Sequence, residues 1–206
     1  MASLRSYETE APLNWEQRFS ITLAKRKWIA VVICCVVAVI VTLPLFISGF
    51  PIGSDAAKHY RWSTEFTKSL SDGALYPRWF PEANRGGGSP MPLYYPPLPF
   101  YVAAAFNVIT GDMLTAISLG CCLALALSGL TMYGFSRLTL SRPMSLMAAV
   151  LYMLIPYHIL DLYQGAALSE FWSFALIPPI FYFTYRMSEE TSLRAASGLT
   201  LSYVLL

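Results

Sequence analysis

The sequence predicts an all-α, polytopic transmembrane protein whose long first outer loop carries in-plane juxtamembrane helices. Two observations predict this fold class. First, 56% of the residues are hydrophobic and only 13% are charged, whereas about 25% are charged in ordinary soluble proteins. Second, the run Trp28 to Phe50 is long enough to cross a bilayer, which takes roughly 20 apolar residues. The apolar runs and the positions of Lys and Arg then divide the chain into elements.

Residues 1–27 are predicted to form a cytoplasmic N-terminal segment. They are too long and too mixed in charge for the start of a signal peptide. The basic cluster 25–27 precedes the first span and, by the positive-inside rule, holds the N-terminus in the cytoplasm. Ahead of it, three apolar side chains recur at helical spacing: Trp15, Phe19 and Leu23. This segment is either a short amphipathic helix on the inner leaflet or a frayed polar tail.

Residues 28–50 are the predicted first transmembrane helix, and residues 51–112 form an extracytoplasmic loop with two in-plane helices. The first of these helices is indicated by a polar stripe at alternating steps of three and four. The stripe consists of Lys58, Arg61, Glu65, Lys68 and Asp72, beside an apolar stripe of Trp62, Phe66 and Leu70. Gly73 is a natural left-handed terminator of this helix. The glycines at 86–88 predict a flexible turn that allows close backbone approach.

The second in-plane helix is the apolar run Leu98 to Ile109. It has about a dozen residues, fewer than the 17 to 25 needed to span a bilayer. If it crossed, four later arginines would face the outside: Arg137, Arg142, Arg186 and Arg194. If it lies in the outer interface as a re-entrant or juxtamembrane helix, those arginines become cytoplasmic. We adopt the second interpretation.

Residues 113–206 are predicted to form a helical membrane bundle of about three spans plus a truncated fourth. The spans are Leu114 to Phe135, Pro143 to Tyr157, Phe171 to Tyr185, and a last one from about Ala195 to Leu206. The last apolar run has no polar terminus, which indicates the N-terminal part of a longer protein. The four cysteines form two adjacent pairs within apolar runs, where they behave as small hydrophobic residues.

Candidate site residues gather in the two predicted outer loops. Asp55 and His59 are four residues apart, so on a helix both point to the same side. Asp55 is either a functional group or the N-cap of the in-plane helix, and His59 is either functional or a polar residue on a solvated face. In the second outer loop, residues 158–170, either Asp161 or Glu170 could join Asp55 in a carboxylate cluster able to hold a divalent cation. Alternatively, Glu170 caps the following span.

Three basic residues of the first outer loop are candidates for binding a lipid phosphate: Lys58, Arg78 and Arg85. The alternative is that they anchor the loop at the lipid headgroups. A role as a headgroup anchor is favoured more for Lys58, which lies on the predicted helix, than for Arg85, which lies among glycines.

The combination of motifs from Gly53 to Glu170 resembles the start of C-type glycosyltransferases. The motifs are the Gly73–Trp79 run, the Gly88–Pro90 turn and the Tyr94–Leu98 entry into a second in-plane helix. More closely, the chain is similar to bacterial and archaeal membrane proteins with a 6-pyruvoyl-tetrahydropterin synthase-related domain. The later segments Pro156–Tyr157, Asp161–Tyr163 and Gly165–Glu170 fit that group too.

The resemblance implies roles for several residues. Asp55 matches the catalytic base of the superfamily, Asp161 or Glu170 would help to bind a metal or the donor, and Arg78 and Arg85 would hold the donor phosphate. Gln164 departs from the pattern, because relatives carry Arg before the Gly-Ala. A soluble pterin synthase needs a zinc site of three histidines, and this chain has only two histidines, so the pterin-related name has no support in a metal site here.

Two functional hypotheses follow. The first is a glycosyltransferase, or the N-terminal part of one, that moves a sugar from a polyprenyl-phosphate-linked donor at the outer face of a prokaryotic plasma membrane. The second is a non-catalytic transporter or assembly scaffold. A transporter places charged residues within its spans, whereas these spans are almost free of them, which favours the enzyme. Membrane lipids are expected partners, nucleic acids are not, and the need for a metal cofactor is open.

Overall fold

The computed structural model describes residues 14, 28–51, 53, 55–190 and 192–206. Over these residues the chain is all-α, as predicted, and β pairing is limited to one antiparallel bridge between Phe80 and Ser89. The predicted N-terminal amphipathic helix and the basic cluster 25–27 lie outside the described residues. The protein consists of a helical bundle and a smaller unit, residues 55–110, which we call the α3–α5 unit.

The bundle is built around α6, Met113–Ser136, which packs against α2, α5, α7 and α9. Helix α2, Trp28–Ile47, turns a seam of mostly small residues toward it: Ala30, Cys34, Ala38, Thr42 and Leu45 are buried. Small residues allow close approach of helix backbones in membrane proteins. At Gly129 of α6 there is no room for a side chain, because an added Cβ would lie 2.3 Å from Met153 Sδ and 3.1 Å from Cys34 Sγ.

The next helical stretch differs from the predicted span 143–157. Helix α7 covers Arg142–Met153, α8 covers Pro156–Leu160, and a π-helical turn, η2, covers Asp161–Gly165. Pro156 occupies the first turn of α8, where its missing N–H is tolerated, so the chain restarts a helix rather than entering a loop. The predicted second outer loop from residue 158 is therefore wrong over its first half, which is helical up to Gly165.

Helix α9, Leu168–Glu189, and helix α10, Leu193–Leu205, complete the bundle. Three helical stretches in the described part are long and apolar enough to cross a membrane: Trp28–Ile47, Met113–Ser136 and Arg142–Gly165. Helix α9 has 22 residues but is less apolar, and it contains Pro178 and Pro179. Helix α5, Leu98–Thr110, has 13 residues, about 20 Å in length, which is short of a hydrocarbon core of about 30 Å.

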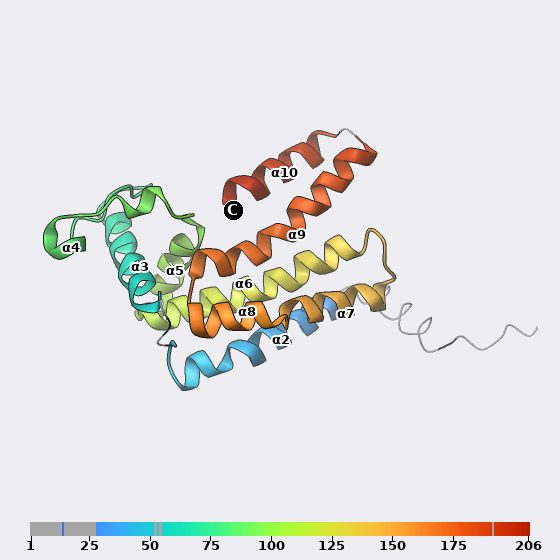
Figure 1. The fold of residues 1–206 in the computed structure, drawn as a ribbon, viewed down its shortest axis with the longest axis horizontal. Helices are drawn as coiled ribbons and strands as arrows, with labels where there is room; N and C mark the ends of the chain where they lie inside the picture. The colour runs from blue at the N-terminus through green and yellow to red at the C-terminus, as the bar shows by residue number, and fades with distance from the viewer. Residues whose placement is uncertain (1–13, 15–27, 52, 54, 191) are drawn as a thin grey trace, which may run out of the picture.

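The two ends of the bundle have different neighbours (Figure 1). Helices α3, α4 and α5 gather at one end, whereas the α6–α7 and α9–α10 connections lie at the other end, with the start of α2. The four later arginines cap or flank these connections: Arg137, Arg142, Arg186 and Arg194. These four arginines therefore share the end of the bundle away from the α3–α5 unit, whereas five other basic residues lie in that unit.

Candidate functional site

The α3–α5 unit has its own aromatic core. Helix α3, Ala56–Ser71, turns its apolar stripe toward α5, and Phe66, Phe80 and Phe100 are each at most 2% exposed. The Phe66 ring packs edge-on against Tyr101, whose hydroxyl donates a 2.6 Å hydrogen bond to the Leu75 carbonyl. As predicted, α3 ends before a left-handed glycine, Gly73, with φ of 94°. The unit is thus a packed platform rather than a loose loop.

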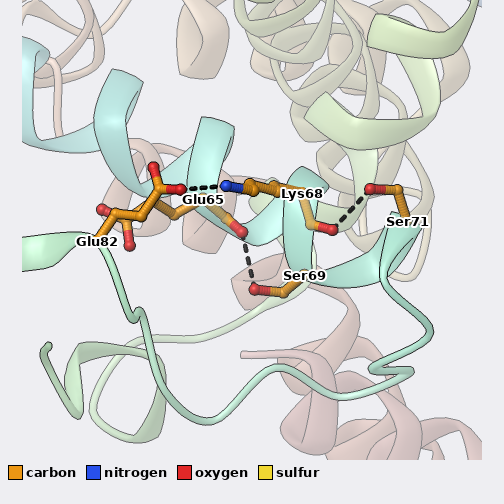
Figure 2. A network of polar contacts seen from close by, with 5 residues as sticks. All are labelled: Glu65, Lys68, Ser69, Ser71 and Glu82. Carbon is orange, nitrogen blue, oxygen red and sulfur yellow. Dashed lines mark hydrogen bonds and ion pairs between the residues drawn. The ribbon is translucent and has the colours of Figure 1, made fainter. Parts of the chain in front are cut away.

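Polar contacts join α3 to the segment that follows it. Figure 2 shows Lys68 in an ion pair with Glu82, and two serines that donate to carbonyls of their own helix. Ser69 Oγ lies 2.9 Å from the Glu65 carbonyl oxygen, and Ser71 Oγ lies 2.7 Å from that of Lys68. The Lys68–Glu82 pair therefore fastens the start of α4, Ala83–Gly86, to the end of α3.

The glycine-rich segment forms a hairpin closed by the Phe80–Ser89 bridge. Both backbone hydrogen bonds of this bridge are 2.9 Å long. At its tip, Asn84 and Arg85 have φ of 53° and 59°, a left-handed conformation that is uncommon outside glycine. Asn84 Nδ2 supports it by donating to the Gly88 carbonyl at 2.9 Å. Left-handed backbone at non-glycine residues is found preferentially at functional sites.

His59 is buried, so the interpretation of this residue as a polar group on a solvated face is wrong. It is 1% exposed and lies among aromatic rings, stacked on Phe100 and edge-on to Trp62 and Tyr95. Burial lowers its pKa to about 4, against a smaller raising effect of the nearby Asp55 carboxylate. Its Nδ1 atom has no hydrogen-bond partner in the described part of the chain. His59 is therefore a neutral member of the platform.

Asp55 stands at the N-cap position of α3, but its side chain caps nothing. Instead, the carboxylate accepts a 2.7 Å hydrogen bond from Lys58 Nζ, and the Asp55 side chain is 32% exposed. This hydrogen bond raises the pKa of Lys58, which keeps the ammonium charged at neutral pH. The position expected for a cap is therefore occupied by an ion-paired carboxylate that solvent can reach.

The start of the first loop contacts the end of the η2 turn. The Asp55 N–H donates to the Gly165 carbonyl at 3.2 Å, and a Cβ on Gly53 would lie 2.6 Å from the Gln164 carbonyl oxygen. Gly53 is therefore required by a close backbone approach. The two regions that carry the predicted acids thus meet through their backbones.

Asp161 lies four residues before Gly165 and is buried next to this contact. It is 7% exposed, its Oδ2 has no hydrogen-bond partner among the described residues, and its Oδ1 would lie 2.9 Å from a Cβ on Gly165. The small gap beside it is lined by apolar groups such as Phe50, Cys121 and Phe171 and has no room for water. Asp161 therefore faces the protein interior rather than an outer cavity.

Glu170 lies in the first turn of α9 and accepts a hydrogen bond from the Tyr157 hydroxyl. No group of three or more His, Cys, Asp or Glu side chains in the described ranges is close enough together to hold a metal ion, so Asp55, Asp161 and Glu170 do not form a three-acid metal site. The pairing of Asp55 with one of the two other acids, and the part of each acid in catalysis, stay predictions.

The predicted phosphate-binding cations differ in their surroundings. Lys58 is paired with Asp55, whereas Arg78 and Arg85 are exposed and make no hydrogen bond or ion pair with the part of the chain that the structure describes. Arg85 sits at the hairpin tip next to Asn84.

At least three cavities flank α3: one of about 380 Å³ lies between α3, the end of α5 and the start of α6, and the other two share residues with each other. The first of these two, of about 420 Å³, lies between the segment after α2, the first two turns of α3 and the start of α6. The second, of about 340 Å³, lies between α3 and the hairpin. Both volumes are within the range of small-molecule sites, roughly 300–1,000 Å³. Residue Arg61 lines both cavities.

Sequence reasoning placed Arg61 on the polar stripe but did not select it as a site residue, and it missed Gly53. A signal for Arg61 was present, because it is the next basic residue on the same helix face as Lys58. The signal for Gly53 was absent, since its partner Gln164 is far away in the sequence.

Comparisons with known proteins give a family match and one relative. A family model described as "6-pyruvoyl-tetrahydropterin synthase related domain; membrane protein" matches residues 93–206. An uncharacterized protein of Lactococcus lactis subsp. cremoris (strain MG1363) is 26% identical over 184 residues, which cover 84% of this chain and 30% of the relative. The chain thus spans about a third of the length of that curated relative. No solved structure matches.

Proposed function

The chain belongs to the family of membrane proteins with a 6-pyruvoyl-tetrahydropterin synthase related domain, and on this premise we propose that it is the N-terminal part of a membrane glycosyltransferase. The donor is a sugar linked to a polyprenyl phosphate, and transfer takes place at the outer face of a prokaryotic plasma membrane. The N-terminus is cytoplasmic in this proposal, which the basic cluster 25–27 supports through the positive-inside rule.

One observation carries the proposal: a partly exposed carboxylate at the junction of α2, α3 and η2, next in the chain to residues that line a cavity. Asp55 does not itself line a cavity, but it lies in the sequence between Gly53 and Ala56, which both line the larger one. It is ion-paired with Lys58, which lines the smaller cavity. A carboxylate and a cation therefore lie within the first turns of a helix that borders two cavities.

The reaction is an inverting displacement at the anomeric carbon. The Asp55 carboxylate takes the proton of an acceptor hydroxyl as its oxygen forms a bond to that carbon. The bond from the anomeric carbon to the phosphate oxygen breaks, and polyprenyl phosphate leaves with the electron pair. Basic side chains of the first loop stabilise the charge on the departing phosphate. The resemblance to C-type glycosyltransferases names Arg78 and Arg85 for this role.

The test is transfer of labelled sugar from a polyprenyl-phosphate donor by the full-length protein in membranes. Asp55→Asn keeps the size of the side chain but cannot take a proton, so transfer should fall by roughly 10²- to 10⁴-fold, the usual contribution of a general base. Lys58→Gln removes the ion pair but leaves the base, and it should retain measurable transfer. Arg194→Ala, at the opposite end of the bundle, is the matched control for expression and folding.

Wild-type transfer by a folded Asp55→Asn protein would remove Asp55 from the mechanism. Absence of transfer by the wild-type protein with every polyprenyl-phosphate donor tried would favour the non-catalytic scaffold.

A further inference from the structure

Two of the cavities beside α3 differ in chemistry and share a wall. The larger has mainly apolar walls formed by residues such as Phe50, Pro51 and Leu114. The smaller has polar and aromatic walls, which include Trp62, Glu65 and Asn84. Two residues of α3 line both: Ala57 and Arg61. A ligand that extends from one cavity into the other would therefore pass Arg61.

Arg61 is not engaged by the protein. Two other cations of α3 have acidic partners, Lys58 with Asp55 and Lys68 with Glu82, whereas Arg61 makes no ion pair or hydrogen bond within the described ranges. Glu65, one turn further along α3, has a buried Oε2 atom without a hydrogen-bond partner in the same part of the chain. Arg61, with its guanidinium unpaired in the described part of the chain, and Glu65 both line the smaller cavity.

We infer that Arg61 binds the phosphate of the isoprenyl phosphate donor, with the apolar chain in the larger cavity and the sugar in the smaller one. The inference rests on the proposed function, since that function supplies an amphipathic donor. A guanidinium is suited to this position because its planar fork of donors matches phosphate oxygens in pairs. Trp62 offers an aromatic wall, and Glu65 and Asn84 offer hydrogen-bond acceptors and donors to sugar hydroxyls.

Arg61 differs in position from the two arginines to which the family resemblance assigns the phosphate. Arg78 and Arg85 line neither cavity. Arg85 follows Asn84 at the rim of the smaller cavity, so its charge can attract an anionic donor, but the direct contact belongs to Arg61. Loss of Arg85 should therefore weaken binding less than loss of Arg61.

The test measures binding rather than transfer, with the full-length protein in detergent and farnesyl phosphate as the probe. Arg61→Ala should weaken binding roughly tenfold or more, because a charge-assisted contact to phosphate is lost. The affinity of Arg61→Lys should lie between those of the wild type and Arg61→Ala, since lysine keeps the charge but lacks the planar pair of donors. Arg194→Ala should bind as the wild type does. Farnesol, which lacks the phosphate, should bind weakly and equally to the wild type and to Arg61→Ala.

A second variant tests where the isoprenyl chain of the ligand lies. Ala57 is exposed on α3, so Ala57→Phe should fold normally while its ring fills the passage between the cavities, and it should weaken farnesyl phosphate binding by a similar factor. Wild-type affinity in both Arg61→Ala and Ala57→Phe would overturn the inference. Equal competition by phosphatidic acid would overturn the assignment to an isoprenyl chain and indicate a general contact with lipid headgroups.

The binding and transfer experiments distinguish failure of this site from failure of the proposed function. Arg61-dependent binding without any sugar transfer would support this site and reject the proposed function. Sugar transfer that is insensitive to Arg61→Ala would support the proposed function and reject this site.

Discussion

The bundle and the α3–α5 unit are stabilised in different ways. In the bundle, small residues such as Ala38, Cys121 and Ala124 are fully or almost fully buried, and the gap beside Asp161 is closed. In the α3–α5 unit, aromatic rings form a small core, while ion pairs and cavities lie around it. The bundle is therefore the rigid support, and the unit at its end holds the groups that can meet a ligand.

The two regions meet at Gly53, so the largest functional effect of a single methyl group is expected there. Gly53→Ala places a Cβ 2.6 Å from the Gln164 carbonyl oxygen, which forces apart the contact that positions Asp55. We expect sugar transfer to fall by roughly 10²-fold, the size of effect that a displacement of about 1 Å can have. The thermal stability of the bundle should change little. Unchanged transfer would mean that the contact does not position Asp55.

A matched pair of glycines tests the close packing of the bundle. Both lie in α6, but an added Cβ meets Met153 Sδ at 2.3 Å at Gly129 and nothing within 4 Å at Gly134. Gly129→Ala should destabilise the protein by about 1–3 kcal/mol through overpacking, whereas Gly134→Ala should be neutral or slightly stabilising. Thermal unfolding in detergent measures both. Equal melting temperatures would contradict the difference in packing.

The α3–α5 unit should respond to pH through His59. The pKa of folded His59 is about 4, below its ordinary value of 6.5, so unfolding takes up a proton once the pH falls below about 6.5. The free energy of unfolding is therefore highest above pH 6.5 and falls as the pH drops from 6.5 toward 4, by on the order of 2 kcal/mol at pH 5. His59→Phe, which keeps an aromatic ring, should flatten this dependence in a comparison of melting temperatures at pH 7.5 and pH 5. The same pH dependence in both proteins would exclude His59 as its source.

Local patterns predicted the helices of the fold. The period of α3, its end at Gly73 and the turn among the glycines at 86–88 all follow from neighbouring residues, and each is present in the structure. The continuation of the helix beyond Tyr157 was missed, because polar residues such as Asp161 and Gln164 led to the prediction of an outer loop from residue 158. The sequence does not show that Asp161 is buried within a helical segment.

Burial of the site residues could not be predicted, because their neighbours are distant in the sequence. His59 is covered by Tyr95 and Phe100, and Asp161 is covered by Phe50 and Cys121. Spacing within a helix shows that two side chains share a face, but not what lies opposite that face. The proposed roles of Asp55 and Arg61 depend on such long-range contacts, which is why the sequence suggested Asp55 as a candidate but did not select Arg61.

The most direct test of the account is to locate an isoprenyl phosphate on the protein. The probe is farnesyl phosphate with a photoreactive diazirine on its chain, irradiated with the full-length protein in membranes and followed by mass spectrometry of the labelled peptides. We expect label on the walls of the larger cavity, in the peptides that contain Phe50 to Arg61 and Leu114, and a marked loss of that label in Arg61→Ala but not in Arg194→Ala. Label confined to the exposed faces of α9 and α10, or unaffected by Arg61→Ala, would contradict the account.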